Sequence, residues 1–169
     1  MDAASLPWSE ACLRTAAAAI TGVVLGLNRD LHGKPIGVRT LGAVAVACCS
    51  LTLAAAQFGE QAGNHAAETM GRATQGLMAG IGFLGGGVIL RNPPKQIHGL
   101  TTAALVWLTA ALGVACGVGA WSVIGAALAA VLLLLAFGGG VELGVHLLVN
   151  RLRRAVGERP LPPDRASRS

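Results

Sequence analysis

The first residues that could carry out chemistry lie in Gly26–Thr40 (GLNRDLHGKPIGVRT). Asp30 stands there between Arg29 and Arg39, across a turn that glycine and proline favour. The simplest expectation is an ion pair that joins two helices. The alternative is an ion or partner site that uses Asp30, with Asn28 as a second oxygen and His32 as a proton acceptor. One carboxylate is little for a divalent cation, since magnesium sites use one or two carboxylates with water or phosphate.

Two further polar groups stand at the starts of apolar stretches. Arg72 and Gln75 precede one of them, and we expect such side chains to face the interior of a helix bundle or a cavity instead of lipid. Thr101 or Thr102 is expected to cap the next helix with its hydroxyl. His98 beside this cap is either a sensor of pH near neutrality or a simple hydrogen-bond partner of a carbonyl group.

Signatures of enzymes and of metal sites are missing from the sequence. It has no Walker lysine loop, no GxSxG, no HExxH and no pair of carboxylates close together in an apolar stretch. Cys12, Cys48, Cys49 and Cys116 show no spacing typical of metal ligands, so we interpret them as small packing residues. We therefore predict a non-enzyme, with no catalytic residue, no metal and no cofactor.

The elements that must position these residues are membrane helices. The chain has 169 residues, of which 53% are hydrophobic and 12% charged, too apolar for an ordinary soluble domain. A helix needs about 20 apolar residues to cross the hydrocarbon core. We predict an all-α bundle of about five transmembrane helices, with Arg14 the only charge inside them and reaching to the interface. The windows are Ala11–Leu27, Thr40–Phe58, Ala73–Leu90, Leu100–Gly119 and Ala120–Phe137.

The basic residues predict the orientation. Of the 13 lysines and arginines, all but Arg14 and Arg72 fall in the first and third connections or the C-terminal tail. By the positive-inside rule the N-terminus is outside and the C-terminus is cytoplasmic, with Gln57–Arg72 as a solvated outer loop. The net charge of +5 is thus expected to meet lipid head groups and not nucleic acid.

Glycines four residues apart indicate close helix packing. The alternative for Gly85–Gly87 is a loosened backbone that exposes carbonyl groups to a cavity. The glycines expected to pack helices are Gly22, Gly26, Gly76, Gly80, Gly82, Gly85, Gly86 and Gly87.

Three regions follow from this pattern. Residues 1–137 form the transmembrane domain, and residues 138–155 form an amphipathic helix at the membrane interface, with Glu142, His146 and Asn150 on one face. Residues 156–169, rich in proline and arginine, form a disordered basic tail.

Three blocks in order carry a resemblance to a known family: GLNRDLHGKPIGVRT, GRATQGLMAGIGFLGGGVIL and HGLTTAALVWLTAALGVACGVG. The chain resembles the membrane domain of the MgtC/SapB family over Gly22–Gly119, and more loosely to Phe137. It departs from the family pattern at Asn28, where a glutamate is expected, and a role that needs this carboxylate does not carry over. Many members add a cytoplasmic domain after the last helix, whereas only Gly138–Ser169 follows here.

The resemblance implies a multi-pass protein of the bacterial inner membrane that is linked to magnesium limitation, acid stress and virulence. It also implies a regulator that restrains another membrane complex, the F-type ATP synthase, and has no nucleotide site. Two alternatives remain. One is a cation or proton pathway lined by Asp30, Gln75, Thr101 and Thr109, and the other is a homo-oligomer that forms through the glycine faces.

Overall fold

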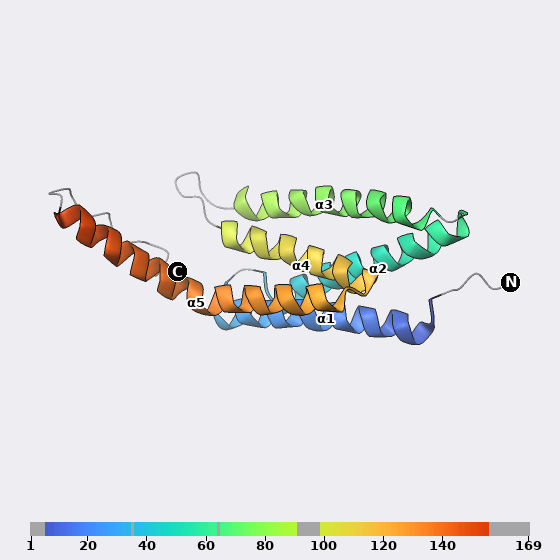
Figure 1. The fold of residues 1–169 in the computed structure, drawn as a ribbon, viewed down its shortest axis with the longest axis horizontal. Coiled ribbons are helices and arrows are strands. Elements are labelled where there is room, and N and C mark those ends of the chain that lie inside the picture. The colour runs from blue at the N-terminus through green and yellow to red at the C-terminus, as the bar shows by residue number, and fades with distance from the viewer. Residues whose placement is uncertain (1–5, 35, 64, 91–98, 156–169) are drawn as a thin grey trace. The chain divides into compact units, whose positions relative to one another are not determined.

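The computed structural model describes residues 6–34, 36–63, 65–90 and 99–155 of the chain, with the side chains of 90, 138–148 and 150–155 left aside. These residues form helices and short turns, which confirms the all-α prediction. Figure 1 shows the helices in chain order: α1 (Trp8–Leu31), α2 (Val38–Gln61), α3 (Ala66–Leu90), α4 (Leu100–Val118) and α5 (Trp121–Ala155).

The helices cover the predicted windows almost completely, and some of them extend beyond these. α2 ends at Gln61 and α3 begins at Ala66, so the prediction of a loop over Gln57–Arg72 is wrong for residues 57–61 and 66–72. Alanines favour the helical state, and Glu68 in the first turn faces the positive end of the helix dipole. Glu68 also pairs with Arg72 one turn later, at 2.9 Å between Oε1 and Nη2.

Length and hydropathy mark α1, α2 and α4 as candidate membrane spans among the described residues. The segment Trp121–Phe137 of α5 is apolar but shorter. The protein is therefore a multi-pass membrane protein, while the crossing of all five helices and the sides on which the termini lie stay predictions.

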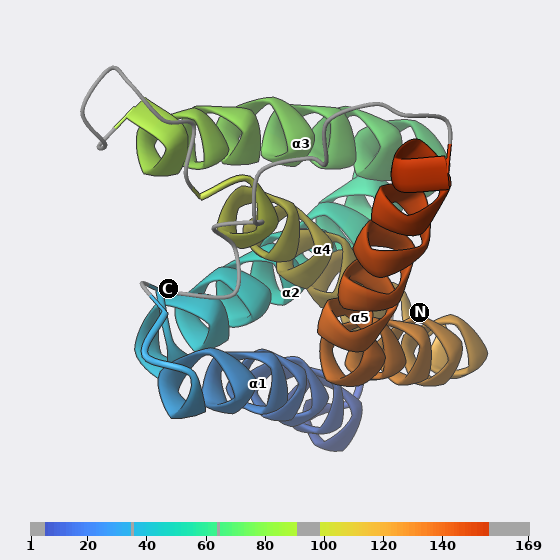
Figure 2. The same cartoon turned by 90° about the vertical axis from the view of Figure 1, so that its left-hand side faces the viewer.

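α1, α2 and α4 pack against one another (Figure 2), and one cluster of their buried core consists mainly of small side chains. Cys49 and Cys116 are fully buried there with Ala18 and Ala45, and Ile124 closes the cluster. Small residues allow helices to approach closely where lipid removes the hydrophobic drive for association. Two of the four cysteines thus do the packing expected of them, and Cys48 is buried as well, whereas Cys12 is exposed.

Close helix contacts occur at glycines of α1 and α4. A Cβ atom on Gly22 would lie 2.7 Å from the Gly42 Cα, and one on Gly26 would lie 2.4 Å from the Val38 Cα. Gly113 and Gly117 of α4, which the sequence analysis did not single out, approach α2 in the same way.

The glycines of α3 were also expected to pack against neighbouring helices, and most of them do not. Only Gly85 has a neighbour, the Ala103 Cβ at 3.7 Å from the position of its own missing Cβ. The others have nothing within 4 Å, so they do not pack helices within the described part of the chain. They are Gly76, Gly80, Gly82, Gly86 and Gly87. α3 is also a regular helix through Gly85–Gly87, so the loosened backbone expected as the alternative is not seen.

α5 is one continuous helix of 35 residues. The glycines at 138–140 do not interrupt it, and the predicted boundary between a last span and an interfacial segment stays a prediction. Residues 138–155 are helical as predicted, and their position at the interface stays a prediction. The chain divides into two compact units, Met1–Gly125 and Ala126–Ser169, and the predicted tail 156–169 lies outside the described residues.

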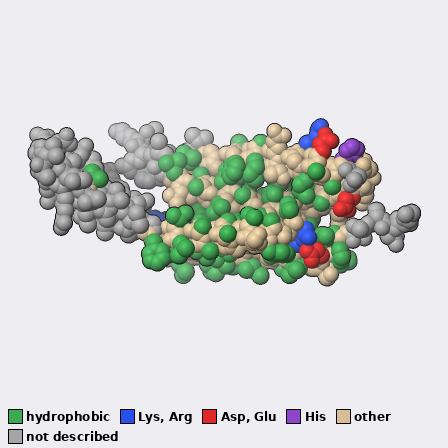
Figure 3. Space-filling model, viewed as in Figure 1, with side chains coloured by type: hydrophobic (Ala, Val, Ile, Leu, Met, Phe, Trp, Pro, Cys, Tyr) green, Lys and Arg blue, Asp and Glu red, His purple; other side chains and the backbone are tan. Residues whose placement is uncertain are grey.

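Charged side chains gather at one end of the face shown in Figure 3, while apolar side chains and backbone cover the middle. This is the end where α1 and α3 begin. The distribution matches a body that crosses a membrane with its polar groups at the surface.

Candidate functional site

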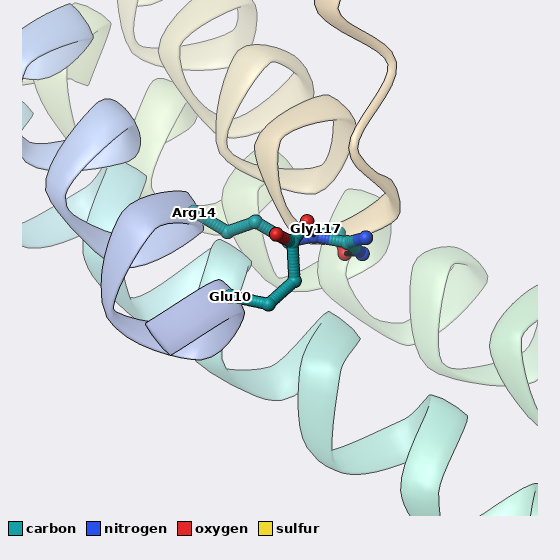
Figure 4. Close-up of polar contacts among 3 residues, drawn as sticks. All are labelled: Glu10, Arg14 and Gly117. Atoms are coloured by element: carbon teal, nitrogen blue, oxygen red, sulfur yellow. Dashed lines mark hydrogen bonds and ion pairs between the residues drawn. The ribbon is translucent and has the colours of Figure 1, made fainter. Parts of the chain in front are cut away.

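The contacts of charged side chains in the first unit lie at two opposite ends of the bundle. At the first end, Arg14 joins the start of α1 to the end of α4 (Figure 4). Its Nε donates to Glu10 Oε1 at 2.8 Å, and its Nη1 donates to the carbonyl oxygen of Gly117 at 2.8 Å. The guanidinium therefore connects two helices, and its position at the membrane interface stays a prediction.

Local sequence explains this contact. Glu10 and Arg14 are four residues apart on one helix, a spacing that brings opposite charges together. The last carbonyl groups of a helix have no partner within it and carry the negative end of its dipole, so a cation is favoured there. Gly119 ends α4 with a φ of 80°, and a Cβ at that position would lie 3.0 Å from the guanidinium.

A small cavity lies beside this contact. It encloses about 60 Å³ and is lined by Leu6, Leu53, Ala56, Gln57, Glu60 and Arg14. Pockets for small-molecule substrates are several times larger, at about 300–1,000 Å³. This cavity has room for water molecules and not for a substrate.

Arg72 and Gln75 do not face the interior. The Arg72 side chain is 79% exposed and forms its ion pair with Glu68 on the surface. Gln75 is exposed too. The prediction of an inward orientation is wrong because α3 packs on its neighbours through another face, where Ile81 is buried.

At the second end, Arg29 lies at the last turn of α1 and is only 5% exposed. Its Nη2 donates to the hydroxyl of Thr102 on α4, and its Nε has no hydrogen-bond partner. The sequence analysis named both residues but did not foresee that they meet. The signal that could have suggested it is an arginine at the end of an apolar stretch, which needs an acceptor from a neighbouring helix.

Asp30 does not form the expected ion pair with Arg29 or Arg39 in the described part of the chain. Its Oδ2 accepts a hydrogen bond from the backbone N–H of Val38 at 3.1 Å, at the start of α2. Gly37 provides the space, since a Cβ there would lie 1.6 Å from Asp30 Oδ1. A carboxylate at the N-terminus of a helix satisfies a free amide and the helix dipole, so Asp30 caps α2.

The remaining candidate residues are not brought together. Asn28 is half-buried, and Arg39 and Thr101 are exposed. The hydroxyl of Thr109 is buried and donates to the Leu105 carbonyl of its own helix. Of the residues of the predicted pathway, Gln75 and Thr101 are thus exposed, whereas Asp30 and Thr109 bond to backbone groups, and the pathway itself stays a prediction.

The helix cap expected from Thr101 or Thr102 is also absent. Gly99 occupies the cap position with a φ of 90°, and no side chain caps α4. Thr102 uses its hydroxyl as the acceptor for Arg29 instead. His98 lies outside the described residues, so its role as a sensor stays a prediction.

Among the described residues, no group of three or more His, Cys, Asp or Glu side chains is placed to hold a metal ion. The arrangement thus holds helices together by capping, ion pairing and glycine contacts. It also leaves one face of α3 exposed, around Gly76, Gly80 and Phe83.

Comparison with known proteins gives one family. The sequence model described as the MgtC family matches residues 15–142. Protein SrpB of Synechococcus elongatus is 39% identical over 121 residues, which are 68% of this chain and 66% of SrpB. Protein SapB of Bacillus subtilis is 38% identical over 63% of this chain and 47% of its own length.

Protein MgtC of Salmonella typhimurium is 34% identical over 107 residues, which are 63% of this chain and 43% of that protein. The chain thus spans about half to two thirds of the length of the curated relatives it matches. No solved structure matches the chain.

Proposed function

The chain belongs to the MgtC family, and from this premise we propose that it is a regulatory protein of the bacterial inner membrane that acts through helix contacts with another membrane complex. The F-type ATP synthase is the partner we put forward, on the resemblance of the three sequence blocks. A role under magnesium limitation, under acid stress or in virulence belongs to the same proposal.

The observation that carries the proposal is the exposed surface of α3. Gly76 and Gly80 lie one turn apart with nothing within 4 Å of their missing Cβ positions, and Phe83 beside them is 84% exposed. Small residues at this spacing allow the backbone of another membrane helix to come close. Because no helix in the described part of the chain occupies this place, a partner helix is the occupant that we propose.

The internal use of polar groups also supports a role in contact and not in transport. Arg14, Asp30 and Thr109 each bond to groups that belong to the helix framework. A conducting path needs polar groups that line a continuous opening. We therefore propose no ion pathway, enzyme activity or cofactor for this protein.

The test uses a matched pair of substitutions on α3. Gly80→Leu and Gly71→Leu both place a leucine where nothing lies within 4 Å, and nine residues put the two positions on opposite sides of the helix. Both variants should fold and insert equally. We expect the membrane complex that co-purifies with the full chain in mild detergent to be lost in Gly80→Leu and kept in Gly71→Leu.

Identification of the co-purifying subunits by mass spectrometry tests the partner. Recovery of ATP synthase subunits with the Gly71→Leu variant, together with restrained ATP hydrolysis in membrane vesicles, would support the full proposal. Equal recovery of partners by both variants would contradict contact through this face of α3.

A further inference from the structure

The arginines at the two ends of the bundle differ in whether they form ion pairs. At the end where α1 and α3 begin, Arg14 pairs with Glu10 and Arg72 pairs with Glu68. At the other end, the described residues hold no ion pair for the buried Arg29. This contrast identifies Arg29 as a buried cation whose counter-charge the described residues do not supply.

Arg29 is unusual in how little its guanidinium bonds. The group has five N–H donors in a flat fork, and it is always charged. The Thr102 hydroxyl, which is neutral, takes Nη2, while Nε is buried with no acceptor. A charge taken out of water is normally paired and hydrogen-bonded, because burial otherwise costs much free energy.

Among the side chains that the structure describes, few carboxylates could fill this place. Asp30 is the adjacent acid, and its Oδ2 is bonded to the amide of Val38. Glu10, Glu60 and Glu68 lie on the helix turns of the opposite end. The segment 91–98 before α4 reads RNPPKQIH and contains no acidic residue.

The position of Arg29 along its helix indicates where the missing anion comes from. It lies two residues before the end of α1, a candidate membrane span, and therefore at the depth where hydrocarbon gives way to head groups. The backbone of Lys34 bonds to the Arg29 carbonyl at 3.1 Å, and Arg39 is exposed at the start of α2. Basic pockets between membrane helices at this level bind the head groups of anionic lipids.

We propose that Arg29 binds a phosphate group, that of an anionic phospholipid head group. The phosphate oxygens accept from guanidinium N–H groups that Thr102 does not use, at the small part of Arg29 that stays exposed, and Lys34 and Arg39 add positive charge around it. The site needs only a membrane around the protein and is independent of any partner complex.

Lipid binding to the full chain in mild detergent tests this site, with affinities measured by native mass spectrometry. Phosphatidylglycerol is the probe, and Arg29→Lys is the variant because it keeps the charge but loses the flat fork. We expect Arg29→Lys to weaken phosphatidylglycerol binding about tenfold, the effect of losing one charge-assisted hydrogen bond. Arg72→Lys is the matched control at the opposite end and should leave the affinity unchanged.

Measurements on the unchanged protein keep the test valid if the variant fails to fold. Phosphatidylglycerol should raise the midpoint of thermal unfolding, and a neutral glycolipid with the same acyl chains should not. Inorganic phosphate should neither raise the midpoint nor displace the lipid. Displacement by inorganic phosphate would overturn the lipid as the source, and equal affinities of the Arg29→Lys and Arg72→Lys variants would overturn the site.

Discussion

At the level of single residues, the partner of the Asp30 carboxylate is a backbone amide and not a positively charged side chain. Its Oδ2 satisfies the N–H of Val38, one of the amides at the start of α2 that have no partner within the helix. Gly37 cannot do this with a side chain, and α2 has no other side-chain cap at that position.

This assignment predicts different effects for two substitutions of Asp30. Asp30→Asn keeps an oxygen that can accept the hydrogen bond and should leave stability nearly unchanged, whereas Asp30→Ala should cost about 1 kcal/mol. Thermal unfolding of the purified protein in detergent measures both. If Asn were as harmful as Ala, the negative charge and not the cap would be what matters.

At the level of helices, the glycines fall into two classes that their spacing does not distinguish. Gly22 and Gly26 lie against α2, whereas Gly76 and Gly80, with the same spacing, lie against nothing in the described chain. The sequence predicts that a glycine face exists on each helix. It does not predict which neighbour occupies that face, because this depends on how all the helices are arranged.

A pair of alanine substitutions separates the two classes. In Gly26→Ala the new Cβ would meet the Val38 backbone, which can shift only with the helix, and we expect a loss of about 1–3 kcal/mol. In Gly80→Ala the Cβ meets open space, and the higher helix propensity of alanine should leave stability equal or raise it by up to about 1 kcal/mol. Unfolding midpoints in detergent, compared at the same protein concentration, provide the measurement. A loss in Gly80→Ala equal to that in Gly26→Ala would show that α3 packs inside its own chain.

The helices themselves were predictable, and their contacts were not. Apolar runs with polar ends predicted each helix, because crossing a membrane requires a long uncharged stretch. The contact of Arg14 with Gly117 joins residues 103 positions apart, and that of Arg29 with Thr102 joins residues 73 apart. No local pattern encodes such pairs, so the candidate site could be named in part but not assembled from the sequence.

At the level of the whole molecule, the opposite ends of the first unit should lie on opposite sides of the membrane. Arg39 stands at one end and Arg72 at the other, and both are exposed. The basic residues of the connections predict that the Arg39 end is cytoplasmic.

Labelling with a thiol reagent that does not cross membranes checks this arrangement in intact cells. Cys12, the exposed cysteine, is first replaced by serine, while Cys48, Cys49 and Cys116 are buried and should stay unreactive. We expect Arg72→Cys to be labelled from outside and Arg39→Cys to be labelled only after the cells are opened. Labelling of both from outside would contradict the predicted crossing.

The bond between Arg14 and the Gly117 carbonyl also sets an order for biogenesis. The ribosome delivers Arg14 long before Gly117, so the first helix enters the bilayer with Glu10 as its arginine's sole described side-chain partner. The hydrogen bond from Arg14 to the Gly117 carbonyl can form only when the fourth helix has been inserted. Early degradation by membrane proteases should therefore fall most heavily on nascent chains that stop before residue 117.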